Sequence, residues 1–292
     1  MDRKALLVLS SASGHALPEA KVEAICRRLC LAFSRLEVYR LGDLDRDLPL
    51  LEKQAESFDA VLVSGGDGTF NHVVDRLSRL QSPPVFGYLN SGTIGDVGRN
   101  FGVGKSLSRS LRIIEEGHIC QSDLIEINGY RFCYMGAIGA YSDISYSTPR
   151  RLKALAGRLA YYDMAIREAF KKKTVHYRLS FPDGSTLEGE APFIMVLNGR
   201  NVGGFPVNRN CAIDDGLFEV YLSRKGVFNG LLHYLPFNRN KPIKADEIWI
   251  QSDYPGPWCI DGEKGPQGDV HIKILKKTIT VFCSKKHSTG RF

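Results

Sequence analysis

A glycine-rich turn placed directly after a short apolar run constrains the fold of this chain more than any other stretch. The run occupies residues 61–63, and the turn follows it as Ser64, Gly65, Gly66, Asp67, Gly68, Thr69, Phe70 and Asn71. Such a run is typical of a strand inside a parallel sheet, and the apolar residues 73, 74, 77 and 80 then recur at helical spacing. Between a strand and a helix, glycines let the backbone approach a phosphate, helix amides donate to it, and Asp67 can hold a divalent cation. We therefore expect a phosphate-binding turn; the alternative is a glycine-rich connection that binds nothing.

Length and composition indicate a globular protein with two domains. Single hydrophobic cores usually stop growing at about 250–300 residues, and this chain has 292, of which 43% are hydrophobic and 24% charged. We expect a nucleotide-binding domain at residues 1–118 and a β-rich substrate domain at residues 119–277, with the last strands, about 278–292, able to return to the first domain. No apolar run approaches about 18 residues, so we expect a soluble, cytoplasmic protein whose membrane contact is peripheral.

A formal net charge of +7 points to anionic partners. Nucleotides, membrane headgroups and nucleic acid all qualify, and a solvated basic surface without a partner is the alternative. Because no motif interleaves basic and aromatic residues, we expect no nucleic-acid binding. Arg150, Arg151 and Lys153 are candidates for contact with an anionic bilayer. The seven cysteines include no Cys-x-x-Cys pair, which indicates reduced thiols and argues against zinc.

The first half of the chain alternates strands and helices. Strands predicted at residues 5–9, 36–41, 59–63 and 85–89 are separated by helical patterns, the second from its alternation and the others from their apolar runs. This alternation predicts a parallel sheet covered by helices on both faces. A hydroxyl-rich turn follows the first of these strands, and Ser10, Ser13 and Gly14 in it are expected to offer another phosphate contact.

A second glycine-rich turn, residues 90–100, follows the strand at residues 85–89. Thr93 can donate its hydroxyl to a phosphate, Asp96 can join a metal or water network, and Arg99 can pair with an anion. The alternative is that Asp96 and Arg99 only cap the next helix. Ligands of such sheets bind beyond the carboxyl ends of the strands, so we expect both glycine-rich turns to face one crevice.

Strands dominate from residue 119 onward. Asn128 and Gly129 give a strong hairpin signal between strands at residues 120–127 and 130–135. Further strands are predicted at residues 175–181, 187–190, 193–197, 217–222, 247–250, 270–275 and 279–282. A long amphipathic segment at residues 150–170 is the exception. The fold class we infer is α/β plus all-β, the second domain being mostly antiparallel.

Two acidic clusters stand in this second half. Asp214 and Asp215 precede a strand, where nearby backbone carbonyls could complete an oxygen site for Mg²⁺; on spacing alone, an ordinary turn is the slightly favoured alternative. Asp261 and Glu263 flank Gly262 after an apolar run. Such a pair can supply a general base beside a phosphoryl donor if the fold brings it near Asp67.

Taken together, these motifs resemble the catalytic family of soluble diacylglycerol kinases and related lipid kinases, including sphingosine and ceramide kinases. The resemblance extends along nearly the whole chain. The first turn alone is shared with NAD kinases and resembles phosphofructokinases, whereas the late Asp-Gly-Glu triplet favours lipid kinases. The motifs that carry it are Gly65, Gly66, Asp67, Gly68, Thr69 and Asn71; Gly92, Thr93, Asp96 and Arg99; Asn198, Gly203 and Gly204; Asp214, Asp215 and Gly216; and Asp261, Gly262 and Glu263.

The resemblance implies a phosphofructokinase-like or NAD-kinase-like α/β domain followed by a β-sandwich. Asp67 and Asp96 would serve a magnesium and water network. Asp215, with the carbonyls of Ala212 and Leu217, would hold a second, structural Mg²⁺. The base would be Asp261 or Glu263, with Glu263 narrowly favoured. The implied ATP contacts are Ser10, Ser13, Gly14, Gly65, Gly66, Asp67, Gly68, Thr69, Asn71, Thr93 and Asp96.

The activity implied is transfer of the γ-phosphoryl group of Mg·ATP to the hydroxyl of a diacylglycerol-like or sphingoid lipid at a membrane surface, as part of phospholipid biosynthesis. Two alternatives stay open: a kinase of NAD or another soluble alcohol, and a catalytically weakened protein that binds nucleotide or membrane. A homodimer is an option. Departures from the family pattern motivate the weakened alternative, and they are Leu41, His72, Asn90, Ser91, Ile94, Gly95, Arg209 and Cys211.

Overall fold

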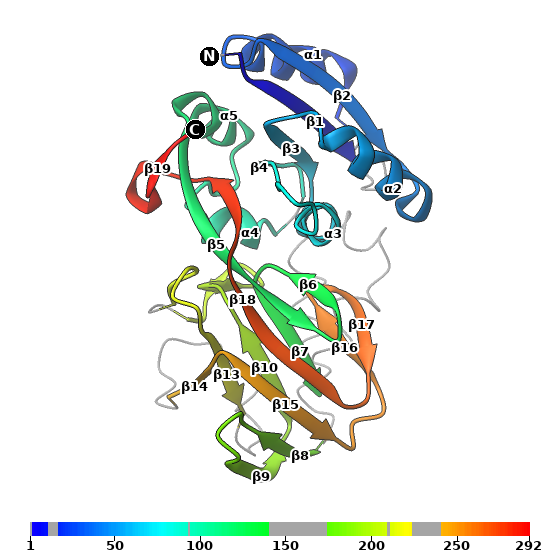
Figure 1. Ribbon diagram of the computed structural model, residues 1–292, viewed down its shortest axis with the longest axis vertical. Coiled ribbons are helices and arrows are strands. Elements are labelled where there is room, and N and C mark those ends of the chain that lie inside the picture. The colour runs from blue at the N-terminus through cyan, green and yellow to red at the C-terminus, as the bar shows by residue number, and fades with distance from the viewer. Residues whose placement is uncertain (1, 11–16, 93, 140–173, 209–210, 224–240) are drawn as a thin grey trace. The chain divides into compact units, whose positions relative to one another are not determined.

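The computed structural model describes residues 2–10, 17–92, 94–139, 174–208, 211–223 and 241–292 (Figure 1). They form two compact units, of which one comprises Met1–Ser122 with Lys277–Phe292 and the other Asp123–Lys276. Two strands, β5 (His118–Ile127) and β18 (Val270–Phe282), run from one unit into the other. The amphipathic segment predicted at residues 150–170 lies outside the described residues. Within the described part of the chain, the helices are too short or too polar to span a membrane.

The first unit contains a parallel sheet in the order β2, β1, β3, β4, followed by the end of β18. The strands are β1 (Lys4–Ser10), β2 (Arg35–Leu41), β3 (Ala60–Gly65) and β4 (Val85–Asn90). Every residue of β3 is buried, as its run of aliphatic side chains predicts for a central parallel strand. The unit also contains an antiparallel pair, in which β19 (Gly290–Arg291) pairs with the start of β5.

Helices connect these strands and cover the sheet. They are α1 (Glu19–Leu29), α2 (Leu44–Ala55), α3 (Asp67–Leu77), α4 (Asp96–Asn100) and α5 (Leu107–Glu116). In α1 the buried residues Val22, Ile25 and Leu29 share one face, which follows from their spacing of three and four. Helix α5 begins at the side-chain cap of Ser106 and ends at Gly117, whose φ of 68° favours glycine.

The second unit is built from antiparallel strands in two sheets. One holds the start of β18 with β15 (Glu247–Ser252), β8 (Val175–Ser180) and β9 (Thr186–Ala191), and β5 pairs there with β6 (Tyr130–Phe132). The other sheet has the order β14 (Ile243–Ala245), β13 (Phe218–Leu222), β10 (Phe193–Leu197), β7 (Met135–Gly139), β16 (Pro257–Ile260), β17 (Glu263–Gln267). A short hairpin joins β11 (Asn201–Val202) to β12 (Phe205–Pro206).

Large side chains from both sheets of the second unit share one core, in which Phe132, Phe218 and Trp258 are almost fully buried. The predicted hairpin at Asn128 and Gly129 is present, and both residues have positive φ, as a two-residue turn of this kind requires. Together the parallel and antiparallel units confirm the predicted fold class, an α/β unit with an all-β unit.

Candidate active site

The two glycine-rich turns meet at the carboxyl ends of neighbouring strands. Strands β3 and β4 are paired so that Gly65 lies opposite Asn90, and the Ser91 amide donates to the Gly65 carbonyl at 3.0 Å. The contact needs glycine, because a Cβ added to Gly92 would lie 2.7 Å from the Gly66 Cα. The structure therefore brings the two predicted turns together in the first unit.

Helix α3 starts within the first turn and leaves its amino end without a side-chain cap. Gly66 is the N-cap residue, and it offers no side-chain acceptor for the first amides of the helix. Such amides, together with the helix dipole, suit a phosphate group. Thr69 on this first helical turn donates its hydroxyl to Ser10 Oγ at 3.2 Å, which ties the turn to the end of β1. Asn71 is buried, and Ser13, Gly14 and Thr93 lie outside the described residues.

Asp67 points toward the second turn. Its Oδ2 accepts from the amides of Gly95 and Asp96 at 3.0 and 3.1 Å, and its Oδ1 from the amide of Val97 at 3.2 Å. Asp67 thus caps helix α4. Burial raises the pKa of the Asp67 carboxyl, and the amides together with the Tyr88 hydroxyl act in the opposite direction.

The Tyr88 hydroxyl lies 3.0 Å from Asp67 Oδ1 and also 3.0 Å from Asn90 Oδ1, so its one proton is shared between two acceptors. With three amides and this hydroxyl around it, the Asp67 carboxylate has donors at about all four of its lone-pair positions. Asp67 does not fit as a direct ligand of a metal ion in this arrangement. Its geometry is that of a residue that positions the second turn.

Asn90 was noted above as a departure from the family pattern, and the structure gives it a definite task. Its Oδ1 accepts from the Gly92 amide at 2.9 Å. A Cβ added to Gly95, whose φ is 70°, would lie 2.4 Å from Asn90 Nδ2. The Asn90 side chain therefore fills the inside of the second turn.

Asp96 and Arg99 form a pair inside α4. Arg99 Nη1 donates to Asp96 Oδ1 and to the Ile94 carbonyl, both at 3.0 Å. The Asp96 side chain is 1% exposed and that of Arg99 20%. The two side chains therefore pair with each other, whereas the amides at the start of α4 are capped by Asp67.

Asp261 and Glu263, the two acids of the late triplet, have different surroundings. Asp261 and Gly262, with φ of 46° and 91°, form the two-residue turn between β16 and β17. The buried Asp261 carboxylate accepts from three consecutive amides, those of Cys133 at 2.9 Å, Tyr134 at 3.3 Å and Met135 at 2.7 Å. Glu263 is exposed, and within the described residues its carboxylate has no hydrogen-bond or ion-pair partner. The geometry favours Glu263 as the acid that is open to a substrate proton.

The residues expected to hold a structural Mg²⁺ lie at a turn in the second unit. Asp215 Oδ1 accepts from the Leu217 amide at 3.2 Å, and the Ala212 carbonyl accepts from Cys211 Sγ at 3.2 Å. Among the described residues, no group of three or more His, Cys, Asp and Glu side chains is arranged to hold a metal ion.

Comparison with known proteins agrees with these motifs. Residues 4–127 match the family model of the diacylglycerol kinase catalytic domain. A diacylglycerol kinase of Staphylococcus aureus strain NCTC 8325 is 27% identical, and the alignment covers 97% of this chain and 93% of the relative. Residues 4–127 thus resemble a diacylglycerol kinase catalytic domain, and nearly the whole chain is similar to diacylglycerol kinases. These similarities indicate a phosphotransferase with an alcohol group as acceptor, a kinase of the lipid-kinase type.

Solved structures share the fold of this chain. A candidate diacylglycerol kinase from Bacillus anthracis strain Sterne has a TM-score of 0.85 at 25% identity, with 98% of both chains covered. A second structure of such a protein from that strain has a TM-score of 0.85 at 24% identity over the same share. The likeness extends over both units and so covers the glycine turns and the late triplet alike.

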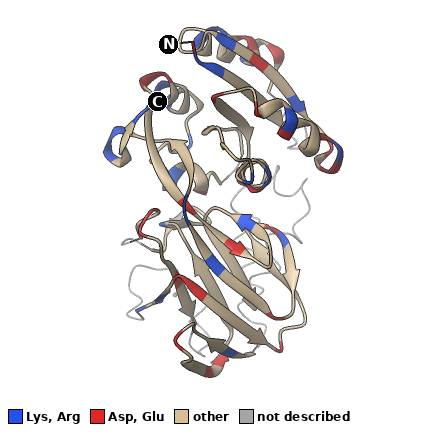
Figure 2. Cartoon of the chain, viewed as in Figure 1, with Lys and Arg blue, Asp and Glu red and all other residues tan. Residues whose placement is uncertain are grey.

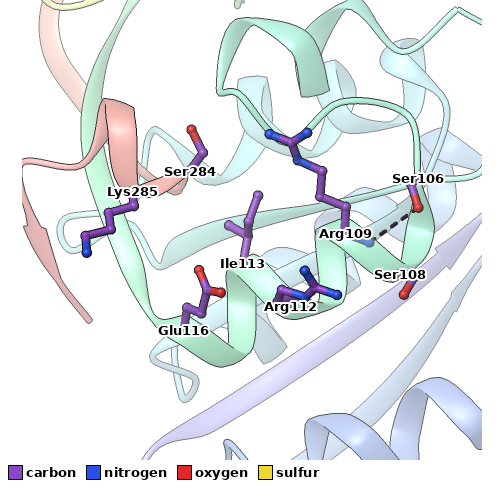
Figure 3. Close-up of a pocket in the computed structure, with 8 residues that line it drawn as sticks. All are labelled: Ser106, Ser108, Arg109, Arg112, Ile113, Glu116, Ser284 and Lys285. Atoms are coloured by element: carbon purple, nitrogen blue, oxygen red, sulfur yellow. Dashed lines mark hydrogen bonds between the residues drawn. The ribbon is translucent and has the colours of Figure 1, made fainter.

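A basic cavity lies on the first unit, apart from the glycine turns. Its volume is about 370 Å³, and it is formed by α5 and by the start of the 3₁₀ helix η1 (Lys285–His287). Figure 3 shows Ile113 at its centre, Arg109 on one side and Lys285 on the other. The cavity shares no residue with the two turns. Its lining is Ser106, Ser108, Arg109, Arg112, Ile113, Glu116, Ser284 and Lys285.

Several side chains that shape the site were not found by sequence reasoning. Tyr88 looked like a core residue of a strand, and its hydroxyl gives no pattern in sequence. Asp123 is fully buried on β5, and its Oδ2 accepts from the Gly216 amide at 2.7 Å, which fixes the Asp215 turn. An acid inside an apolar strand is the signal that could have pointed to Asp123, since a buried charge must find donors.

Proposed function

We propose that this chain transfers the γ-phosphoryl group of Mg·ATP to a hydroxyl of a diacylglycerol-like or sphingoid lipid. The observation that carries the proposal is the contact of the two glycine turns, Gly66 against Gly92, beside the uncapped amino end of α3. Amides there can donate to the phosphate oxygens of a triphosphate. The similarity of residues 4–127 to the diacylglycerol kinase catalytic domain supports a lipid as the acceptor class.

In the proposed mechanism most of the rate comes from positioning and electrostatics, as is general for phosphoryl transfer. The Mg²⁺ enters with the nucleotide as part of the substrate and neutralises charge on the phosphates. Asp67 acts through the second turn, because its carboxylate orients three amides of that turn. Glu263 accepts the proton of the attacking lipid hydroxyl, for which its carboxylate is exposed.

The experiment is a transfer assay with γ-labelled ATP and three acceptors offered separately: diacylglycerol in mixed vesicles, sphingosine in the same vesicles, and NAD. We expect label in a lipid, identified by mass spectrometry, and none in NAD. Glu263→Gln should lower kcat by about 10²–10⁴-fold, the usual contribution of a general base. Lys264→Gln, one residue along the same strand, is the matched control. Label in NAD, or nucleotide binding with no product, would replace the proposal by one of its two alternatives.

We also propose that the enzyme meets its substrate at an anionic bilayer. Arg109, Arg112, Lys285 and Lys286 form what we call the α5–η1 basic group, and all four are exposed. Figure 2 shows the segment just before β19 in the blue of Lys and Arg. Each such cation near an anionic surface contributes about 1 kcal/mol. The candidates Arg150, Arg151 and Lys153 lie outside the described residues.

Vesicle sedimentation tests the bilayer proposal. Changing Arg112, Lys285 and Lys286 to Gln should weaken binding to anionic vesicles by about 100-fold at low salt, since three cations contribute about 3 kcal/mol. Binding of the wild-type chain should fall as salt rises. A control variant removes three exposed cations from α1 and α2, namely Lys21, Arg27 and Lys53. Equal losses in both variants would show general charge attraction and no specific face.

A further inference from the structure

Lys244 lies between two carboxylates at the turn where a structural metal ion was expected. Its Nζ is 3.4 Å from Asp215 Oδ2 and 3.3 Å from Glu219 Oε1. The Glu219 side chain is 3% exposed and that of Asp215 30%. Strand register places the lysine there, because β13 and β14 pair antiparallel with Glu219 directly opposite Lys244. The register therefore fixes the position of Lys244 opposite Glu219, from which its ammonium reaches both carboxylates.

The other groups at this turn are already engaged within the protein. The Asp215 Oδ1 accepts from the Leu217 amide, and the Ala212 carbonyl accepts from the Cys211 thiol. Glu219 Oε2 accepts from Asn208 Nδ2 at 2.9 Å. Two of the three expected metal ligands thus have internal partners.

A divalent ion and the Lys244 ammonium compete for the Asp215 carboxylate. Mg²⁺ requires near-octahedral oxygen ligands at about 2.0–2.1 Å. If Mg²⁺ bound to Asp215, the Lys244 ammonium would lie only a few ångströms from it, and the two cations would repel each other. Water would screen this repulsion little near Glu219, because that side chain is shielded from solvent. Of the two cations, the lysine is supplied by the chain itself and needs no dehydration from bulk solvent.

We infer that Lys244 is a built-in counter-ion that replaces the structural divalent cation at the Asp215 turn, so that this turn folds without metal. The expected metal set of Ala212, Asp215 and Leu217 does not fit Mg²⁺ while Lys244 occupies the position between the two acids. The inference concerns the second unit alone. It stands or falls independently of the phosphoryl transfer proposed above, because its test measures stability and not turnover.

The test compares the melting temperature of the full chain in EDTA and in millimolar Mg²⁺, with NaCl added to match ionic strength. The wild-type chain should melt at the same temperature in both. Lys244→Gln should melt about 3–6 °C lower in EDTA and recover in Mg²⁺, because two acids then share the turn without a cation. Lys241→Gln, an exposed lysine just before the same strand, is the control and should match the wild type.

Two further variants keep the test decisive. Lys244→Arg retains the charge and should remain indifferent to Mg²⁺. Asp215→Asn added to Lys244→Gln should abolish the recovery in Mg²⁺. The inference is overturned if Mg²⁺ raises the melting temperature of the wild type and Asp215→Asn removes that rise, or if Lys244→Gln does not respond to Mg²⁺. If Lys244→Gln folds only in Mg²⁺, that result supports it.

Discussion

Changing the two acids of the late triplet one at a time should separate stability from catalysis. Glu263 is exposed and has no partner within the described residues, so Glu263→Gln should change the free energy of unfolding by less than about 0.5 kcal/mol. Catalysis should suffer, since an amide cannot accept the substrate proton. Asp261 is expected to show the reverse pattern, because its carboxylate is buried and serves the backbone.

The magnitude for Asp261 follows from its three hydrogen bonds. Asp261→Ala removes the acceptor of three consecutive amides, at Cys133, Tyr134 and Met135. A hydrogen bond to a charged group contributes about 1.5–3 kcal/mol, and allowing for water reaching some of the amides we expect a loss of about 3–6 kcal/mol. Asp261→Asn keeps Oδ1, which serves two of the amides, and tolerates the positive φ, so its loss should be about 1–3 kcal/mol.

Urea unfolding followed by tryptophan fluorescence measures these losses. Both tryptophans, Trp249 and Trp258, belong to the second unit, and Trp258 is 1% exposed. The signal therefore reports the unit that contains the triplet. Kinetic constants come from Asp261→Asn, because a loss of 6 kcal/mol is about as large as the whole stability of many domains. If Asp261→Asn keeps its stability but loses as much kcat as Glu263→Gln, Asp261 is the base and the reasoning is refuted.

Three other predictions rest on contacts described above. Gly92→Ala should raise KM for ATP at least about tenfold and lower the melting temperature, since its Cβ would clash with the backbone of Gly66. Gly66→Ala should affect KM alone, because its Cβ would lie 3.7 Å from the Gly92 Cα, an ordinary contact distance. Asp67→Asn, which keeps one acceptor oxygen, should abolish lipid phosphorylation while circular dichroism still shows a folded chain, and full activity would contradict its role. Asp253 raises the pKa of His176. The pair therefore stabilises the folded chain fully below about pH 6.5, and this contribution is lost as pH rises through the raised pKa. His176→Gln should flatten that part of the plot of unfolding free energy against pH.

The fold class could be predicted because its signals are local. Alternating strands and helices imply a parallel sheet, and Asn128 with Gly129 fixes a hairpin through backbone geometry alone. The spacing of apolar residues and the identity of turn residues are signals that extend over only a few positions, so a single sequence is enough to recognise them. The same is true of the glycine turns, since each directly follows a strand of the sheet.

The assignment of individual acids could not be predicted, because burial and cross-strand register decide it. Asp261 and Glu263 are equivalent in sequence, and only the amides of residues 133–135 distinguish them. Lys244 meets Glu219 through the pairing of β13 with β14, a register that no short motif encodes. Asp67, an acid in a turn between a strand and a helix, was a candidate to hold a cation, and the structure surrounds it with amides of the second turn.

The division of the first unit into two stretches of chain has a consequence for biosynthesis. Strand β4 pairs with β18, yet the ribosome makes all of Asp123–Lys276 before it completes β18. Until then the nascent sheet has an open edge at β4, which is the kind of edge that recruits foreign strands. That edge stays open until Lys277–Phe292 has emerged, so rapid synthesis of this chain should increase its dependence on a chaperone that covers the edge.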